Sequence, residues 1–395
     1  MARLWDKGGA TDELLLEFTA GNDYLLDREL VACDAVASAA HARMLQRIGI
    51  LTSGEADKLV SALADIAVQG REFPILWEQE DSHTAIESAL TDTLGDVGKK
   101  IHTGRSRNDQ VLASTRLYVR HFVYHYSRSL RSLADSLLSF ARAHADVPLV
   151  GRTHMQPAMP ASVGLWASSF VQDIRDALEL LKASYRVIDQ CPLGSAAGFG
   201  VPLPLDREYV ATLLGFSRVQ TNVISAGNSR GRIELSLLSV IEQVNLSLSR
   251  FAQDLILWTM PEFGYFTLPA ELTTGSSIMP QKRNPDGLEL LRSRSARVSG
   301  WARSLADITR SLPSGYNRDF QDTKEPVLQA TRTGMTCVLI AERTVQGLVP
   351  QPHKLKAAFA PDVYATDVAL EKVASGMSFR DAYRETAAEL ESLSG

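Results

Sequence analysis

One loop concentrates side chains that could bind an anion and move a proton. It spans residues 274–286 and reads TGSSIMPQKRNPD, so it holds hydroxyls, two cations and an amide. Gly275 allows a sharp turn before Ser276, and the two prolines fix the backbone nearby. These features favour a lid that closes over an anionic ligand and carries a reactive hydroxyl. A phosphate-binding P-loop is excluded, because Lys282 is followed by Arg283 and lacks the glycine that should precede it. A solvated turn between helices is the alternative.

A basic stretch precedes the longest helical span of the sequence. It covers residues 99–110 and reads KKIHTGRSRNDQ. A helix N-terminus attracts anions, and Arg105 and Arg107 add paired donors for a carboxylate or phosphate. The alternative is a basic capping turn with Asn108 or Asp109 as N-cap.

A third stretch, residues 151–160, places a histidine in a turn bounded by prolines. It reads GRTHMQPAMP and lies in the break between two long helical spans. His154 is the best general acid or base by residue type, although a lone histidine is more often structural. A catalytic role requires an orienting carboxylate, and Glu289, on the helix that follows the 274–286 loop, could provide it.

A fourth stretch, SGYNRDFQDTKEP at residues 314–326, is suited to hold a polar, charged ligand. Its candidates are Tyr316, Gln321 and Lys324, and the alternative is a solvated connection between helices.

Two weaker signals remain. His83 follows Glu80, Asp81 and Ser82, where it either caps a short helix or faces a site. The segment 194–198 lacks the spacing and preceding strand of a nucleotide loop, so we interpret it as a turn that allows close helix packing.

Long helices must position these stretches. Apolar residues recur at helical spacing in spans almost free of glycine and proline, and sustained alternation is absent, which predicts an all-α fold with an elongated bundle. The apolar faces are broad enough to suggest packing between subunits. The predicted long helices lie within residues 105–147, 165–191, 232–260, 288–312 and 327–346.

Shorter helices flank this bundle. Thr52 and Glu55 have the spacing of a capping box at the start of one of them, and residues 361–395 are predicted to form a small helical tail. We expect an N-terminal helical domain at 1–104, a central bundle domain at 105–352 and a C-terminal helical unit at 353–395.

Composition excludes several protein classes. The chain has 395 residues and a net charge of −5, which argues against bulk nucleic-acid binding. Its three cysteines form neither a zinc pattern nor a disulfide framework, so we expect free thiols in a reducing cytoplasm. The segment from Met1 to Lys7 has no apolar core, so we expect no signal peptide, and no apolar run is long enough to span a bilayer.

Together the four stretches resemble those of the argininosuccinate lyase family, in the aspartase/fumarase superfamily. The 274–286 loop is similar to the superfamily signature G-S-S-x-M-P-x-K-x-N-P, and Gln281 and Asp286 favour the argininosuccinate branch. The segments 102–110 and 316–324 are more specific to that branch, and the resemblance covers about residues 1 to 390.

The resemblance implies the fold, the assembly and the reaction. The fold would be the three-domain, all-α architecture of fumarase and aspartase. The protein would be a homotetramer in which three subunits build each active site. The reaction would be the reversible β-elimination of argininosuccinate to L-arginine and fumarate in arginine biosynthesis, with a small-molecule substrate, no metal and no organic cofactor.

The resemblance also assigns residues. Ser276 matches the catalytic serine, His154 the catalytic histidine and Glu289 its carboxylate partner, while Lys282 matches the group that stabilises the aci-carboxylate. The predicted substrate-binding residues are Asn284, Thr153, Asn108, Tyr316, Gln321 and Lys324, with Arg107 and His83 added as further candidates. We expect Ser276 to be the base and His154 the acid toward the leaving nitrogen; the opposite assignment stays open.

The sequence departs from the family pattern at three places. Residues 18–23 read FTAGND where a substrate-contacting serine is usual, Ser229-Arg230-Gly231 replaces an Asp-Arg-Asp, and Arg152 replaces a frequent tyrosine. Alternative hypotheses are a sister lyase that releases fumarate from another succinyl adduct, a non-catalytic structural protein like the lens crystallins, and a helical protein that binds nucleic acid.

Overall fold

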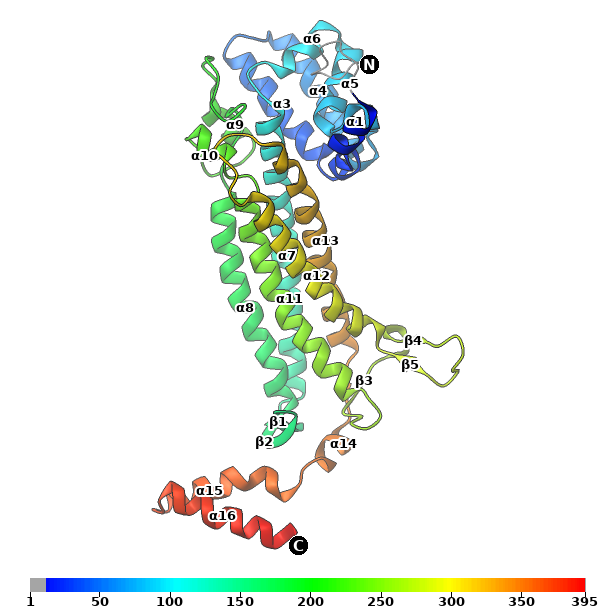
Figure 1. Cartoon of the computed structure of the whole chain (residues 1–395), viewed down its shortest axis with the longest axis vertical. Coiled ribbons are helices and arrows are strands. Elements are labelled where there is room, and N and C mark those ends of the chain that lie inside the picture. Colours follow the sequence, from blue (N-terminus) through cyan, green and yellow to red (C-terminus); the bar gives the residue numbers. More distant parts are fainter. Residues whose placement is uncertain (1–11, 395) are drawn as a thin grey trace. The chain divides into compact units, whose positions relative to one another are not determined.

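The computed structural model describes residues 12–394 (Figure 1). The segment from Met1 to Lys7, on which the expectation about a signal peptide depends, lies outside the described residues. None of the helices in the described part is long and apolar enough to cross a membrane.

Helices dominate the described residues, which confirms the all-α prediction. The long helices are α7 (Arg107–Ala143), α8 (Val163–Ile188), α11 (Arg232–Trp258), α12 (Asp286–Thr309) and α13 (Lys324–Gly347). They match the five predicted spans. The shorter helices are α1 (Glu13–Ala20), α2 (Asp23–Leu26), α3 (Val31–Arg47), α4 (Ser53–Gln69), α5 (Ser82–Leu94), α6 (Asp96–Lys99), α9 (Arg207–Leu213), α10 (Val223–Gly227), α14 (Pro352–Ala357), α15 (Ala365–Ala374) and α16 (Phe379–Ser394).

Three small antiparallel sheets interrupt the helices. The first pairs β1 (Pro148–Thr153) with β2 (Gln156–Ser162), the second β3 (Phe266–Thr267) with β6 (Val349–Pro350), and the third β4 (Thr274–Gly275) with β5 (Arg283–Asn284). The sequence did not predict the β1–β2 hairpin, because β2 contains two prolines and has no alternation of buried and exposed residues.

The chain divides into two compact units that share the long helices. Unit 1 comprises residues 1–127, 179–242 and 297–333, and unit 2 comprises residues 128–178, 243–296 and 334–395. Each of the five long helices contributes one part to each unit. The three predicted domain boundaries remain a prediction.

Unit 1 has its apolar core among the N-terminal helices. The buried face of α3 packs on α4 and α5 through Val31, Leu45, Leu59 and Leu90, together with other apolar side chains. Helix α4 begins with the capping box that the sequence predicted, because Thr52 accepts from the Glu55 N–H and Glu55 accepts from the Thr52 N–H.

The start of α7 differs from the predicted cap. Ser106 occupies the capping position: its N–H donates to Asp109 at 2.8 Å, and its hydroxyl accepts from the Asn108 N–H at 3.3 Å. The prediction of Asn108 or Asp109 as N-cap was therefore wrong by two or three positions. Asp109 is fully buried and also accepts from the N–H groups of Gly194 and Ala196 at 2.9 and 2.8 Å. The 194–198 turn is thus tied to α7 by a carboxylate.

Side-chain hydrogen bonds join the long helices in both units. In unit 1, Tyr118 on α7 meets Thr331 on α13 at 3.0 Å. In unit 2, Trp166 on α8 donates to Asp254 on α11 at 2.9 Å and stacks on Phe251. The C-terminal residues form the helices α15 and α16, as the sequence predicted for the tail.

Candidate functional site

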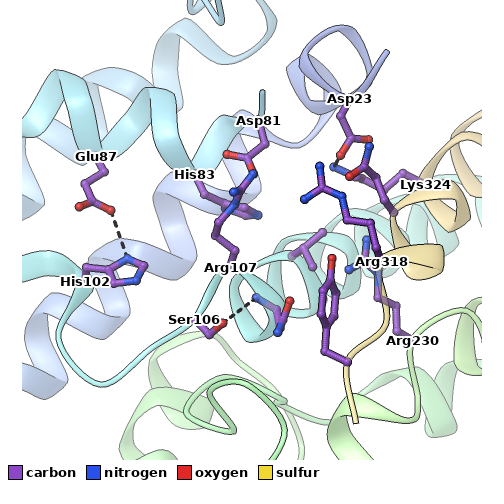
Figure 2. A pocket seen from close by; sticks show the side chains of 14 residues that line it. Asp23, Asp81, His83, Glu87, His102, Ser106, Arg107, Arg230, Arg318 and Lys324 are labelled. Atoms are coloured by element: carbon purple, nitrogen blue, oxygen red, sulfur yellow. Dashed lines mark hydrogen bonds and ion pairs between the residues drawn. The ribbon is translucent and has the colours of Figure 1, made fainter. Parts of the chain in front are cut away.

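A polar cavity of about 520 Å³ lies within unit 1 (Figure 2). It is bordered by the start of α2, by α5, by the start of α7, by the link into α11 and by the segment before α13. We call it the unit 1 pocket. Its lining residues are Asp23, Asp81, His83, Glu87, His102, Ser106, Arg107, Asn108, Val111, Arg230, Tyr316, Arg318, Gln321 and Lys324.

The unit 1 pocket contains six of the residues that the sequence proposed as substrate-binding. They come from three separate stretches of the chain, and the fold brings them to one cavity: His83, Arg107, Asn108, Tyr316, Gln321 and Lys324. Their contact with a substrate remains a prediction.

Lys324 is held at the first position of α13 by two carboxylates. Its Nζ lies 2.8 Å from Asp23 Oδ2 and 2.7 Å from Asp27 Oδ1, and only 5% of the residue is exposed. Burial alone would lower the pKa of Lys324, but the charges of Asp27 and Asp23 outweigh it and raise the pKa. Burial also raises the pKa of Asp23 to about 6, against the opposing charge of Lys324. The ammonium is therefore charged and fixed before any ligand arrives.

Arg107 forms a second ion pair in the pocket. Its Nε donates to Asp81 Oδ2 at 2.7 Å, its Nη2 contacts the same carboxylate, and Nη2 lies 3.2 Å from Glu80 Oε2. Burial opposes ionisation of Asp81, yet the charges of His83 and Arg107 hold its pKa at about 2. Asp81 also caps α5 by accepting from the Thr84 N–H at 2.9 Å, so one carboxylate joins α5 to α7.

His83 points one ring nitrogen at a carboxylate and leaves the other unpaired. Nδ1 lies 2.6 Å from Asp34 Oδ2, whereas the buried Nε2 has no partner in the described part of the chain. Burial opposes protonation of His83, but Asp34 outweighs it and raises the pKa. A protonated His83 could donate from Nε2 to a ligand in the pocket that it lines.

The segment that departs from the family at residues 18–23 still builds the pocket. Its main chain accepts hydrogen bonds at Thr19 O from Gln321 at 2.9 Å and from Arg318 at 2.8 Å. Its last residue, Asp23, is the partner of Lys324. The segment thus anchors three pocket side chains without a serine.

Sequence reasoning missed several of the lining residues. Arg318 lay within a stretch already identified, and Asp81 lay two positions before His83, so proximity along the chain was a signal for both. Asp23 and Arg230 lay only in segments marked as departures, and no local pattern indicated them.

The remaining candidates belong to unit 2. His154 lies at the tip of the β1–β2 hairpin, where it and Met155 have φ of 52° and 65°. Two consecutive positive φ angles are typical of a tight hairpin turn that normally favours glycine or asparagine, so the backbone is strained at the candidate acid. Both side chains and that of Thr153 are exposed.

The 274–286 loop is closed at its base by β4 and β5. The Ser276 hydroxyl accepts from the N–H groups of Ile278 at 3.3 Å and Met279 at 3.1 Å. Lys282 is exposed and Asn284 is half-buried. Backbone donors that point at a serine oxygen favour its alkoxide form, which is the form a base requires.

The expected pairing of His154 with Glu289 is not seen within one copy of the chain. Glu289 is exposed on α12, and among residues 12–394 no hydrogen bond or ion pair joins the two side chains. The unit 1 pocket is lined by unit 1 residues alone, and none of Ser276, His154, Lys282 and Glu289 is among them.

Comparison with known proteins identifies the family. A protein-family model described as "lyase" matches residues 6–300. The argininosuccinate lyase of Sorangium cellulosum (strain So ce56) is 46% identical over 393 residues, covering 99% of this chain and 91% of that protein. The chain therefore belongs to the argininosuccinate lyase family. The argininosuccinate lyase of Xylella fastidiosa (strain Temecula1 / ATCC 700964) is 44% identical over 387 residues, covering 97% of this chain and 87% of that protein.

Solved structures support the fold of this argininosuccinate lyase family member. An EDDS lyase in complex with formate has a TM-score of 0.78 at 26% identity, covering 96% of this chain and 76% of that one. The class II fumarase of Schistosoma mansoni has a TM-score of 0.81 at 20% identity, covering 95% and 91%, and it bears on the fold alone. The expected fumarase-like architecture is confirmed.

Two departures from the argininosuccinate lyase pattern have structural explanations. Arg152 braces the His154 turn: its Nη1 donates to Met155 O at 3.2 Å, and its guanidinium lies over the Phe263 ring at 5.3 Å. Gly231 has φ +77°, and a Cβ there would lie 2.4 Å from Thr309 Cγ2. An aspartate at position 231 would be strained in this chain.

Proposed function

We propose that this protein catalyses the reversible β-elimination of argininosuccinate to L-arginine and fumarate. The observation that carries the proposal is the unit 1 pocket, which gathers six of the eight predicted binding residues from three stretches of a chain whose relatives are argininosuccinate lyases. Arginine biosynthesis would be the metabolic setting, and the three free cysteines fit a reducing cytoplasm.

The reaction requires one proton to leave and another to arrive. A base removes a proton from the CH2 carbon of the succinyl group, which is bonded to one of its carboxylates. The bond between the neighbouring carbon and the guanidino nitrogen breaks, and an acid protonates that nitrogen as it leaves. We assign Ser276 as the base, because the N–H groups of Ile278 and Met279 would stabilise its alkoxide. His154 is the acid. Lys282 and Asn284 would neutralise the charge that develops on the carboxylate.

A complete site needs more than one copy of the chain. The reacting groups are exposed on unit 2 hairpins, and the histidine lacks its carboxylate partner within one copy. Large apolar side chains are also exposed along every long helix, as association between subunits would require: Tyr124, Leu165, Leu180, Leu246, Leu290 and Leu339. We therefore propose a homotetramer with active sites shared between subunits, to be checked by light scattering.

Fumarate release, followed by ultraviolet absorbance, tests the function directly. The purified protein is given argininosuccinate and, in parallel, adenylosuccinate. Turnover of argininosuccinate alone is expected. A folded, tetrameric protein that is silent with argininosuccinate, or that prefers adenylosuccinate, would overturn the proposal. Hydrogen exchange at residues 275–285 tests the lid, and slower exchange with substrate bound is expected.

A further inference from the structure

Arg230 is a buried cation in the pocket wall that has no assigned role. Only 8% of the residue is exposed, and it lines the unit 1 pocket between α10 and α11 (Figure 2). Within residues 12–394, no hydrogen bond or ion pair is formed by its guanidinium. Burying an arginine without a partner is costly, so such a side chain is normally expected to receive a ligand.

The other cationic side chains of the pocket are already engaged. Lys324 contacts Asp23 and Asp27, Arg107 contacts Asp81, and each of the remaining three has a carboxylate or a carbonyl partner: His83 with Asp34, His102 with Glu87, and Arg318 with Thr19 O. Each of these groups is thus held by a protein partner, although His83 Nε2 is unpaired and can also donate to a ligand. Among the described cationic residues of this lining, Arg230 differs in that its guanidinium has no hydrogen bond or ion pair at all.

The neighbours of Arg230 keep it free. The Ser229 hydroxyl accepts from Arg116 Nη2 at 2.5 Å and donates to Ala226 O at 2.6 Å, so its proton and one of its acceptor sites are used within this network and not by Arg230. Gly231 has no side chain, and Thr309 leaves no space for one. Neither flanking residue therefore supplies a carboxylate to Arg230. Glu234, one helical turn further on, is buried and acts on Arg230 by its charge, but within the described residues no hydrogen bond or ion pair joins the two.

The charges around Arg230 select the kind of anion. Tyr316 and the carboxylates of Asp23, Glu234 and Asp27 act electrostatically on Arg230. A ligand end with two carboxylates would be repelled by these aspartates. An α-amino acid end carries one carboxylate and one ammonium, and so complements both signs.

We propose that Arg230 binds the α-carboxylate of the amino-acid end of the substrate. The proposal rests on the proposed function, which makes that end an arginine. Arg230 acts in binding, with its two terminal nitrogens donating to the two carboxylate oxygens, while the succinyl end is left to Lys282 and Asn284.

Arginine and its decarboxylated analogue agmatine isolate the interaction, because they differ only by the carboxylate. Their binding is measured by calorimetry on the full-length wild-type protein and on Arg230→Gln, Arg230→Lys and Arg232→Gln. Arg232 is exposed two positions away and does not line the pocket, so it is a matched control for the lost charge.

The wild-type protein and Arg232→Gln should bind arginine more tightly than agmatine. Arg230→Gln should bind arginine about 10- to 100-fold more weakly and leave agmatine unchanged, and Arg230→Lys should fall between. The melting temperature of Arg230→Gln should not fall, because within residues 12–394 the substitution breaks no hydrogen bond or ion pair and removes a buried charge.

Two results would overturn the proposal: an equal loss of affinity for arginine and agmatine in Arg230→Gln, or equal affinities for the two ligands in the wild-type protein. The calorimetry needs no turnover, so its failure is distinct from that of the proposed function. A wild-type protein that cleaves argininosuccinate while Arg230→Gln binds arginine normally would reject the Arg230 assignment alone.

Discussion

The unit 1 pocket differs from the unit 2 hairpins in how it holds its candidate side chains. The unit 2 hairpins are β1–β2, which carries His154, and β4–β5 with the loop that carries Ser276. In the pocket, Lys324 and Arg107 are fixed by buried carboxylates, and both ion pairs join elements far apart in sequence. On the hairpins, the Ser276 hydroxyl is hydrogen-bonded, within the described residues, only to the backbone of its own loop, and His154 is exposed at a strained turn. The proposed recognition groups are therefore preorganised within one chain, whereas the proposed reacting groups are exposed.

This difference is consistent with a pocket that binds the substrate and hairpins that carry the reacting groups, as proposed. If the unit 1 pocket binds the substrate as proposed, its buried ion pairs hold charged groups in place before binding, which lowers the entropy lost on binding. Exposed hairpins can approach another copy of the chain and can close over the substrate. Mutations in the two regions should consequently have different effects. Hairpin variants should lose turnover and keep arginine binding, whereas pocket variants should lose arginine binding or stability.

Ser276→Ala is expected to have the largest effect on turnover. It removes the proposed base, so kcat for argininosuccinate should fall about 10²- to 10⁴-fold. Arginine binding by calorimetry and the free energy of unfolding should remain near the wild-type values, because the hydroxyl makes contacts only within its loop. A variant with wild-type turnover would remove Ser276 from the mechanism.

Mixing two inactive variants sharpens the comparison between the regions. Asn108→Ala alters the unit 1 pocket and should also lose most of its turnover. If a site takes its pocket from one copy and Ser276 from another, reassembled mixtures of Asn108→Ala and Ser276→Ala should regain activity. Mixtures that stay inactive although mixed tetramers form would contradict shared sites.

Lys324→Met should have the largest effect on stability. It leaves Asp23 and Asp27 buried without their cation, and removing one partner of a buried pair typically costs about 3–5 kcal/mol. Urea unfolding at fixed protein concentration measures the loss. Lys282→Met, on the exposed loop, is the matched control and should change the unfolding free energy by less than about 0.5 kcal/mol. If the two variants lowered the free energy of unfolding equally, the proposed difference between the pocket and the loop would be wrong.

The long helices could be predicted from the sequence because their signal is local. The span 105–147 contains no glycine or proline, and α7 fills most of it. The β1–β2 hairpin could not be predicted in the same way, since Pro157 and Pro160 argue against strands and the pairing depends on register with β1.

The pocket was predictable only in part, and the reason is distance along the chain. Residue types in the stretches near Asn108 and Tyr316 indicated polar recognition. The pairing of Lys324 with Asp27 joins residues 297 positions apart, and no spacing rule contains it. Arg230 was missed because its significance lies in what its neighbours lack, which only the packing around Gly231 reveals.

The pH dependence of stability probes how dry the pocket is. Burial raises the pKa of Asp23 from 3.8 to about 6 in the folded protein, so between these pH values the folded chain holds a proton that the unfolded chain has lost. The stabilising contribution of Asp23 is complete below about pH 4 and is lost as pH rises through 6. The difference between the two pKa values corresponds to at most about 3 kcal/mol.

Asp23→Asn should remove this dependence. Its unfolding free energy, measured by urea unfolding at fixed concentration, should improve relative to the wild type as pH rises from about 4 to 7, by up to about 3 kcal/mol. Asp57→Asn removes an exposed carboxylate from its pair with Arg43 and should differ from the wild type by less than about 1 kcal/mol at either pH. A constant difference between Asp23→Asn and the wild type across this range would mean that Asp23 ionises as freely in the fold as in the unfolded chain. The carboxylate of Asp23 would then be as accessible to water as the side chains on the hairpins. The distinction between a buried pocket and exposed hairpins would no longer hold for this residue.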